Sequence, residues 1–134
     1  MANALYDKGR QRFLEAQLNW LTDTIKVTMV DTAFYTFNVS HEFLSSVPDT
    51  ARTGTPALLT AKTSINGAAD GGDVTFAAVT GPSIEAIVIY KDTGDAATSP
   101  LIAFIDAATG LPITPNGGDI IITWDNGINK IFRI

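Results

Sequence analysis

The chain contains a single histidine, His41, with three serines close by, so serine-based catalysis is the first chemistry to consider. A catalytic triad needs a general base that is held by an acid and aimed at the serine hydroxyl. Ser40, Ser45 and Ser46 are near His41 in sequence, but no Gly-x-Ser-x-Gly elbow surrounds any of them. We therefore favour a structural role for His41, in which its ring anchors a turn by hydrogen bonding.

The acidic residues offer two arrangements that could attract a cation. Asp70-Gly-Gly-Asp73 superficially resembles a calcium loop, but it lacks the alternating oxygen ligands and the final bidentate glutamate of such a site. Asp92, Asp95 and Asp106 would meet at an ion only if their turns met at one end of the fold. Because aspartates often bond to their own backbone in turns, we favour turn formation and predict no metal or other cofactor.

No other catalytic or cofactor motif is apparent in the sequence. Glu85 has no marked carboxylate partner of the kind that glycoside hydrolysis requires. Asn116-Gly117-Gly118 lacks the Lys-Ser/Thr pair that completes a P-loop. Without an acid–base or nucleophile constellation, the sequence predicts a protein that is not an enzyme.

The two tryptophans, Trp20 and Trp124, raise the possibility of a stacking platform for sugars. Trp124 shares its alternation phase with Ile120 and Ile122, so it would point to the same side of a strand as they do. Tryptophans placed in this way usually pack in a core or an interface. We therefore predict that Trp124 belongs to the core.

Length and composition predict one globular domain of 134 residues, which is long enough to bury a stable core. The chain is 46% hydrophobic and has no cysteine, so disulfides and thiolate metal sites are excluded. The first residues lack the apolar core of a signal peptide. No stretch approaches 18 apolar residues, so we predict cytosolic synthesis and no membrane partner.

Charge is distributed unevenly along the chain. Residues 1–67 carry six basic and six acidic side chains, whereas residues 68–134 carry three basic and eight acidic ones, which gives the net charge of −5. An acidic surface repels the phosphate backbone, so nucleic-acid binding is disfavoured. Lys8, Arg10 and Arg12 form the only basic cluster, which is either the solvated side of a helix or a docking surface.

The N-terminal segment predicts the only convincing helix, over residues 4–18. The side-chain oxygen of Asn3 could cap the free N–H groups of the first turn. From Leu5 to Phe13 and beyond, apolar residues recur at a spacing of three to four, which aligns them on one face. Gly9 is a poor helix former, but it would allow a close approach to a sheet or a partner.

The rest of the chain reads as short β-prone runs separated by turn residues. Phe34–Val39 is either a short strand or an ordered loop, His41–Pro48 is expected to form a helical turn capped by Ser40, and residues 49–55 are expected to be a loop. The predicted strands are Ile25–Val30, Leu58–Ile65, Val74–Val79, Ala86–Tyr90, Leu101–Ile105, Asp119–Trp124 and Ile128–Ile134.

This pattern favours a mainly β fold: an antiparallel β-sandwich or small barrel with one N-terminal α-helix. We expect Val74–Val79, Ala86–Tyr90 and Leu101–Ile105 to be neighbouring strands at its centre, and Asp125-Asn-Gly127 to close a terminal hairpin. The single domain, 1–134, would comprise a helical segment at 1–22 and a β-sandwich at 23–134.

Several blocks together resemble small structural proteins of tailed bacteriophages, in particular capsid decoration, or cement, proteins. The resemblance covers nearly the whole chain. It is carried by Val27–Thr32, His41–Pro48, Leu59–Thr63, Asp73–Phe76, Glu85–Gly94, Ser99–Asp106 and Thr114–Trp124, including the strings IKVTMVDT, AIVIYKDTG, SPLIAFID and GGDIIITW.

The resemblance implies a small β-sandwich, jelly-roll-like in some members, on the outer surface of a virion capsid. Its partners would be the major capsid protein, whose subunits it bridges, and copies of itself in a dimer or trimer. The helix, the 40–56 loop and the Pro-rich 111–118 loop are the candidate attachment surfaces. Their candidate contact residues are Lys8, Arg10, Arg12, His41, Arg52, Pro112 and Pro115.

Two other functions stay open on the sequence alone. The first is a tail, baseplate or fibre-associated virion component, which would be present in few copies rather than hundreds. The second is a small carbohydrate-binding module that uses Trp124, Tyr90 and Tyr35.

Overall fold

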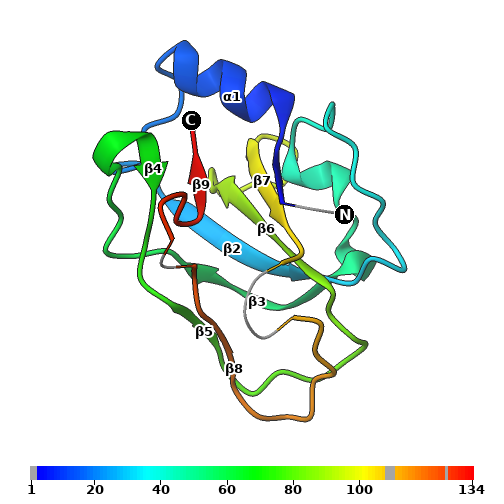
Figure 1. Cartoon of the computed structure of the whole chain (residues 1–134). Coiled ribbons are helices and arrows are strands. Elements are labelled where there is room, and N and C mark those ends of the chain that lie inside the picture. The colour runs from blue at the N-terminus through cyan, green and yellow to red at the C-terminus, as the bar shows by residue number, and fades with distance from the viewer. Residues whose placement is uncertain (1–2, 108–110, 126) are drawn as a thin grey trace.

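A computed structural model describes residues 3–107, 111–125 and 127–134 (Figure 1). Over these ranges the protein is mainly β, with one α-helix near the N-terminus, as the sequence predicts. The helix is α1 (Asp7–Leu14), and three short 3-10 turns are η1 (Leu44–Ser46), η2 (Asp49–Ala51) and η3 (Ile65–Gly67). The strands are β1 (Ala4–Leu5), β2 (Ile25–Val30), β3 (Arg52–Leu58), β4 (Ala68–Ala69), β5 (Val74–Phe76), β6 (Ala86–Lys91), β7 (Leu101–Ile105), β8 (Ile120–Ile122) and β9 (Phe132–Arg133).

The main sheet is antiparallel, and its strand order in the described chain is β1-β7-β6-β2-β3. Its centre is formed by β2, β6 and β7, which are buried along almost their whole length. The sequence correctly predicts that β6 and β7 are neighbours. The prediction that Val74–Val79 pairs with them is wrong, because β5 pairs with β8 in a separate ribbon.

Both faces of the main sheet are covered. Strand ribbons β4-β9 and β5-β8 pack on one face, where Met29, Ile87 and Ile122 join a core that also contains both tryptophans. The loop from Asp31 to Ala51 covers the opposite face and buries Val88. Strand β2, which the sequence predicts at Ile25–Val30, is therefore covered on both faces, and even Thr28 is fully buried.

The N-terminal segment differs from the predicted helix. Ala4 and Leu5 pair with β7 as a strand, so α1 begins only at Asp7 and ends at Leu14. Asn3 does not cap the helix; its side-chain oxygen accepts the backbone N–H groups of Asp106 and Ala107 at 3.0 and 3.1 Å. The open edge of β7 explains the change. When Ala4 and Leu5 form a strand, they pair with backbone N–H and C=O groups of β7 that would stay unpaired if these residues were helical.

The segments from 49 to 65 and from 125 to 134 also depart from prediction. Residues 49–55 are not a loop but contain η2 and the start of β3, and β3 ends at Leu58, where a strand was expected to begin. At the C-terminus, β9 pairs with β4 rather than returning along β8, so the predicted terminal hairpin is wrong. Asn126, in the predicted turn, lies outside the described residues.

Gly9 gives the close approach that the sequence suggested. A Cβ atom at Gly9 would lie 2.7 Å from the carbonyl oxygen of Leu101 and 3.1 Å from the Cα of Ile102. Both are backbone atoms of β7, which cannot move aside without disturbing the sheet. The absence of a side chain at this position therefore lets α1 lie directly against β7.

The alternation in β8 gives a paired test of strand register. Replacing buried Ile122 with Ala is expected to lower the free energy of unfolding by about 2–4 kcal/mol, because the change leaves a cavity in the core. Exposed Ile121 is the matched control, and its change to Ala should alter stability by about 0.5 kcal/mol or less. Urea titration of both variants measures the difference, and equal losses would contradict the register.

The contact at Gly9 predicts an inverted response to a helix-favouring substitution. In a free helix, Gly→Ala stabilises by about 1 kcal/mol. Here Gly9→Ala is expected to destabilise the protein by about 1–3 kcal/mol, because the methyl group collides with the backbone of β7. Thermal unfolding checks this, with the exposed position Gln11→Ala as the control in the same helix. A gain in stability for Gly9→Ala would show that the close contact is wrong.

Candidate partner-binding groove

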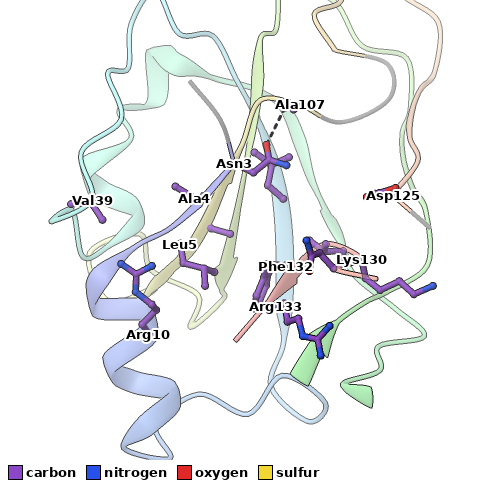
Figure 2. A pocket seen from close by; sticks show the side chains of 14 residues that line it. Asn3, Ala4, Leu5, Arg10, Val39, Ala107, Asp125, Lys130, Phe132 and Arg133 are labelled. Carbon is purple, nitrogen blue, oxygen red and sulfur yellow. Dashed lines mark hydrogen bonds between the residues drawn. The ribbon is translucent and has the colours of Figure 1, made fainter. Parts of the chain in front are cut away.

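A groove of about 710 Å³ lies between β1 and β9, the first and last strands of the described chain (Figure 2). Its floor includes Ala103 and Ile105 of β7, and Arg10 of α1 lies at one side. Residues 125 and 129–131, which precede β9, form the opposite wall. The groove therefore joins segments from both ends of the sequence.

The edge of β1 that borders the groove has unpaired backbone groups. Tyr6 donates its N–H to the Ile102 carbonyl at 3.0 Å, and the preceding residue, Leu5, lies opposite Ala103. Because paired and unpaired positions alternate along antiparallel strands, the N–H and C=O of Leu5 point away from β7.

The edge of β9 has the same property. Ile134 donates its N–H to the Gly67 carbonyl at 3.0 Å, and Arg133 lies opposite Ala68. By the same alternation, the backbone groups of Arg133 point away from β4. Both figures place β9 between β4 and β1, so this edge is on the side of the groove.

The groove is basic on a protein that is acidic overall. Arg10, Lys130 and Arg133 line it together with one acidic residue, Asp125. Arg10 forms an ion pair with Asp7 at 2.6 Å. Lys130 and Arg133 form no ion pair within the part of the chain that the structure describes. These two cationic side chains border the groove and also a neighbouring hollow that Asp70 helps to line.

The structure scatters the predicted contact residues and places only Arg10 in the groove. The other basic ones are held by the protein itself: Arg12 pairs with Glu42 at 2.7 Å, and Arg52 pairs with Asp49. Lys8 donates to the side chain of Gln11 at 3.2 Å. Each of the three basic residues of α1 therefore has a different local partner.

The two proline candidates lie away from the groove. Pro112 borders a second hollow of about 510 Å³, which is lined by Tyr35, Phe37 and Phe104 and by the carboxylates of Glu85 and Asp106. Pro115 is half-buried in the loop that precedes β8. Burial alone would raise the pKa of Glu85, but hydrogen bonds from the Ser83 and Thr32 side chains and the Thr32 backbone lower it, so this rim is anionic.

His41 holds a turn, as the sequence predicts, through a chain of hydrogen bonds. Its Nδ1 lies 2.9 Å from the Tyr35 hydroxyl, which in turn lies 2.8 Å from the hydroxyl of Tyr6. Burial raises the pKa of both phenols, and their mutual hydrogen bond raises the pKa of Tyr6 further. These hydrogen bonds link the loop from Asp31 to Ala51 to Tyr6, which lies between β1 and α1. None of the three serines near His41 takes part in them.

Two of the three aspartates that were considered for an ion, Asp92 and Asp95, form hydrogen-bonded turns. Asp92 accepts the N–H of Gly94 at 3.0 Å, and Asp95 accepts the N–H of Ala97 at 2.9 Å. A hydrogen bond from Lys26 lowers the pKa of Asp92, which the Gly94 bond lowers further. Within the described ranges, no group of three or more His, Asp or Glu side chains is placed to hold a metal ion.

Both tryptophans are buried and fix the loop between β4 and β5. The indole N–H of Trp20 donates to the Asp70 carbonyl at 3.1 Å, and that of Trp124 donates to the Gly72 carbonyl at 2.8 Å. Trp20 also packs edge-on against Phe132 of β9, with ring centroids 5.2 Å apart. Tyr35 and Tyr90 are buried as well, so the aromatic residues suggested for sugar binding offer no exposed platform.

Sequence reasoning missed the groove, although one signal pointed to it. Lys130 and Arg133 are two of only three basic residues in the acidic second half of the chain. The sequence analysis paired the terminal strand with the wrong neighbour. It therefore did not predict that Lys130 and Arg133 line the same groove as Arg10, which lies more than a hundred residues earlier.

Comparison with known proteins identifies no relative of this chain. No protein-family model matches the chain, and a search of curated proteins finds no similar sequence. The described residues also contain no helix with the length and hydropathy of a membrane span.

The hydrogen bond between the Tyr6 and Tyr35 hydroxyls predicts that removing the hydroxyl of Tyr35 costs more stability than removing that of Tyr90. Tyr35→Phe is expected to lower the free energy of unfolding by about 1–3 kcal/mol, because it leaves the Tyr6 hydroxyl without its partner in the core. Tyr90→Phe is the control, since the Tyr90 hydroxyl makes no hydrogen bond to the described residues, and its cost should be about 0.5 kcal/mol or less. Guanidinium unfolding compares them, and equal costs would rule out the hydrogen-bonded chain.

Proposed function

We propose that this chain is a structural virion protein that decorates a bacteriophage capsid and stabilises it by bridging major capsid protein subunits. In this role it would lie on the outer capsid surface as a dimer or trimer, and it would not be an enzyme. The proposal rests first on the resemblance of its sequence blocks to cement proteins.

The observation that carries the proposal is where those blocks fall in the fold. IKVTMVDT and AIVIYKDTG contain β2 and β6, and SPLIAFID and GGDIIITW contain β7 and β8. Three of these strands are the central ones of the main sheet, and β8 packs on its face through the same core. The resemblance thus concerns the residues that determine the fold, which supports a shared architecture rather than a chance match of surface motifs.

Two further features suit attachment to a repeating surface. The net charge of −5 would keep the free protein soluble before assembly. The groove offers free strand edges and unpaired cations, which are groups that bind another protein chain. On a capsid, many modest contacts of this kind would combine into strong retention if each copy touches several subunits.

The proposal predicts saturable binding to isolated phage heads. Labelled protein added to heads stripped of their own copies should bind at a fixed ratio to the major capsid protein, and bound heads should resist heat or osmotic shock better than stripped ones. Heads saturated beforehand with unlabelled protein are the control and should bind little label. Binding to tails alone would move the protein to the tail or baseplate, and binding to neither would remove the virion role.

A further inference from the structure

We propose that the groove between β1 and β9 binds an extended, acidic segment of a partner protein, which adds to β1 as the next strand of the main sheet. This inference names the mode of attachment and rests on the proposed function, in which the partner is a capsid subunit. The mode itself is argued from the groove alone.

The first argument is the difference between the two edges of the main sheet. The β3 edge is protected: Pro56 lacks an N–H, Gly54 adopts a φ of 72°, and the pairing of β2 with β3 shifts register near them. Strand β5 also packs against β3. These are the devices that prevent a sheet from pairing with another chain.

The β1 edge lacks these particular features, although β1 itself is only two residues long. It contains no proline and no shift in register, and the outward N–H and C=O of Leu5 face the groove rather than another strand of the described chain. The backbone of Val39 reaches only the far end of the strand, where its carbonyl accepts the N–H of Asp7 at 2.9 Å. An open edge beside a groove is the geometry of strand addition.

The second argument is the chemistry of the side chains in the groove. Leu5, Ala103, Ile105 and Phe132 form an apolar floor, and Arg10, Lys130 and Arg133 stand around it. Side chains of an added strand alternate between two directions. Apolar residues of the segment would face the floor, and acidic residues between them would reach the cations, so the preferred segment alternates acidic and apolar residues.

The backbone groups select a peptide over a nucleic acid. A phosphate backbone would satisfy the cations, but it could not exchange paired N–H and C=O hydrogen bonds with Leu5. The net charge of −5 on the rest of the protein also repels a long polyanion, whereas a short acidic segment meets only the local basic field.

The test is a titration of the intact protein with a synthetic peptide of about eight residues, which is a common strand length, that alternates Glu and Val and has blocked ends. NMR with amide hydrogen exchange follows binding at low ionic strength. We expect saturable binding and slowed exchange at the Leu5 amide. A peptide that alternates Lys and Val should bind at least about tenfold more weakly, because its charges oppose the groove. A Glu–Val peptide with N-methylated alternate amides should bind weakly, because it cannot donate to the edge of β1.

Charge reversal on the protein supplies the matched variants. Arg133→Glu should weaken binding of the Glu–Val peptide about fivefold or more at low salt, whereas Lys8→Glu should leave it unchanged. Both side chains are exposed and both changes alter the net charge equally, but only Arg133 lines the groove. Unchanged far-ultraviolet circular dichroism would establish that both variants are folded.

Several results would overturn the inference. Equal weakening by the two variants would mean non-specific attraction, and tight binding of the N-methylated peptide would mean that no strand is added. Protection of Leu5 that rises with protein concentration alone would assign the edge to a second copy. Heads that bind wild-type and Arg133→Glu proteins equally would retain the decoration role while removing this groove as its attachment site. If the wild-type protein itself does not bind heads, the proposed function is wrong.

Discussion

The burial of three central strands on both faces is the constraint on which the rest of this structure depends. A strand whose side chains are apolar on both faces needs a covering layer on each side of the sheet, because an uncovered apolar face would remain in water. Here β2, β6 and β7 are in that position. The two short ribbons cover one face, and a largely irregular loop of about twenty residues covers the other. Within that loop the structure has two 3-10 turns, η1 and η2, and no strand. Hydrogen bonds that join Tyr6, Tyr35 and the partly buried His41 link the loop to the N-terminal segment.

Sequence patterns were most informative where a segment's conformation depends on its own residues. The continuous apolar runs at Ala86–Tyr90 and Leu101–Ile105 identified the central strands, and the alternation around Ile122 identified its buried face. The pairing of distant segments was less accessible, because it depends on which edges remain free after the centre has formed. Ala4 and Leu5 fit a helical stripe equally well, and only the open edge of β7 makes them a strand.

In the candidate site too, local features could be predicted from the sequence, whereas contacts between distant segments could not. The basic cluster that contains Arg10 could be recognised in the sequence. Lys130 and Arg133 are brought to the groove only by the tertiary pairing of β9 with β4, which the sequence did not predict. The predicted basic cluster of α1 separated for a complementary reason: helical geometry turned Arg12 toward Glu42 and Phe43, while Arg10 stayed at the groove. Spacing along a chain indicates which charges are near one another, but local partners decide which of them remain available.

The edge-on packing of Trp20 against Phe132 gives the protein a built-in optical probe. Phe132 is part of the groove floor, and its ring centroid lies 5.2 Å from that of Trp20, whose indole N–H donates to the Asp70 carbonyl. A ligand that shifts β9 would alter the environment of this indole, whereas Trp124 contacts a different part of the same loop. A change in tryptophan emission would then report occupancy of the groove.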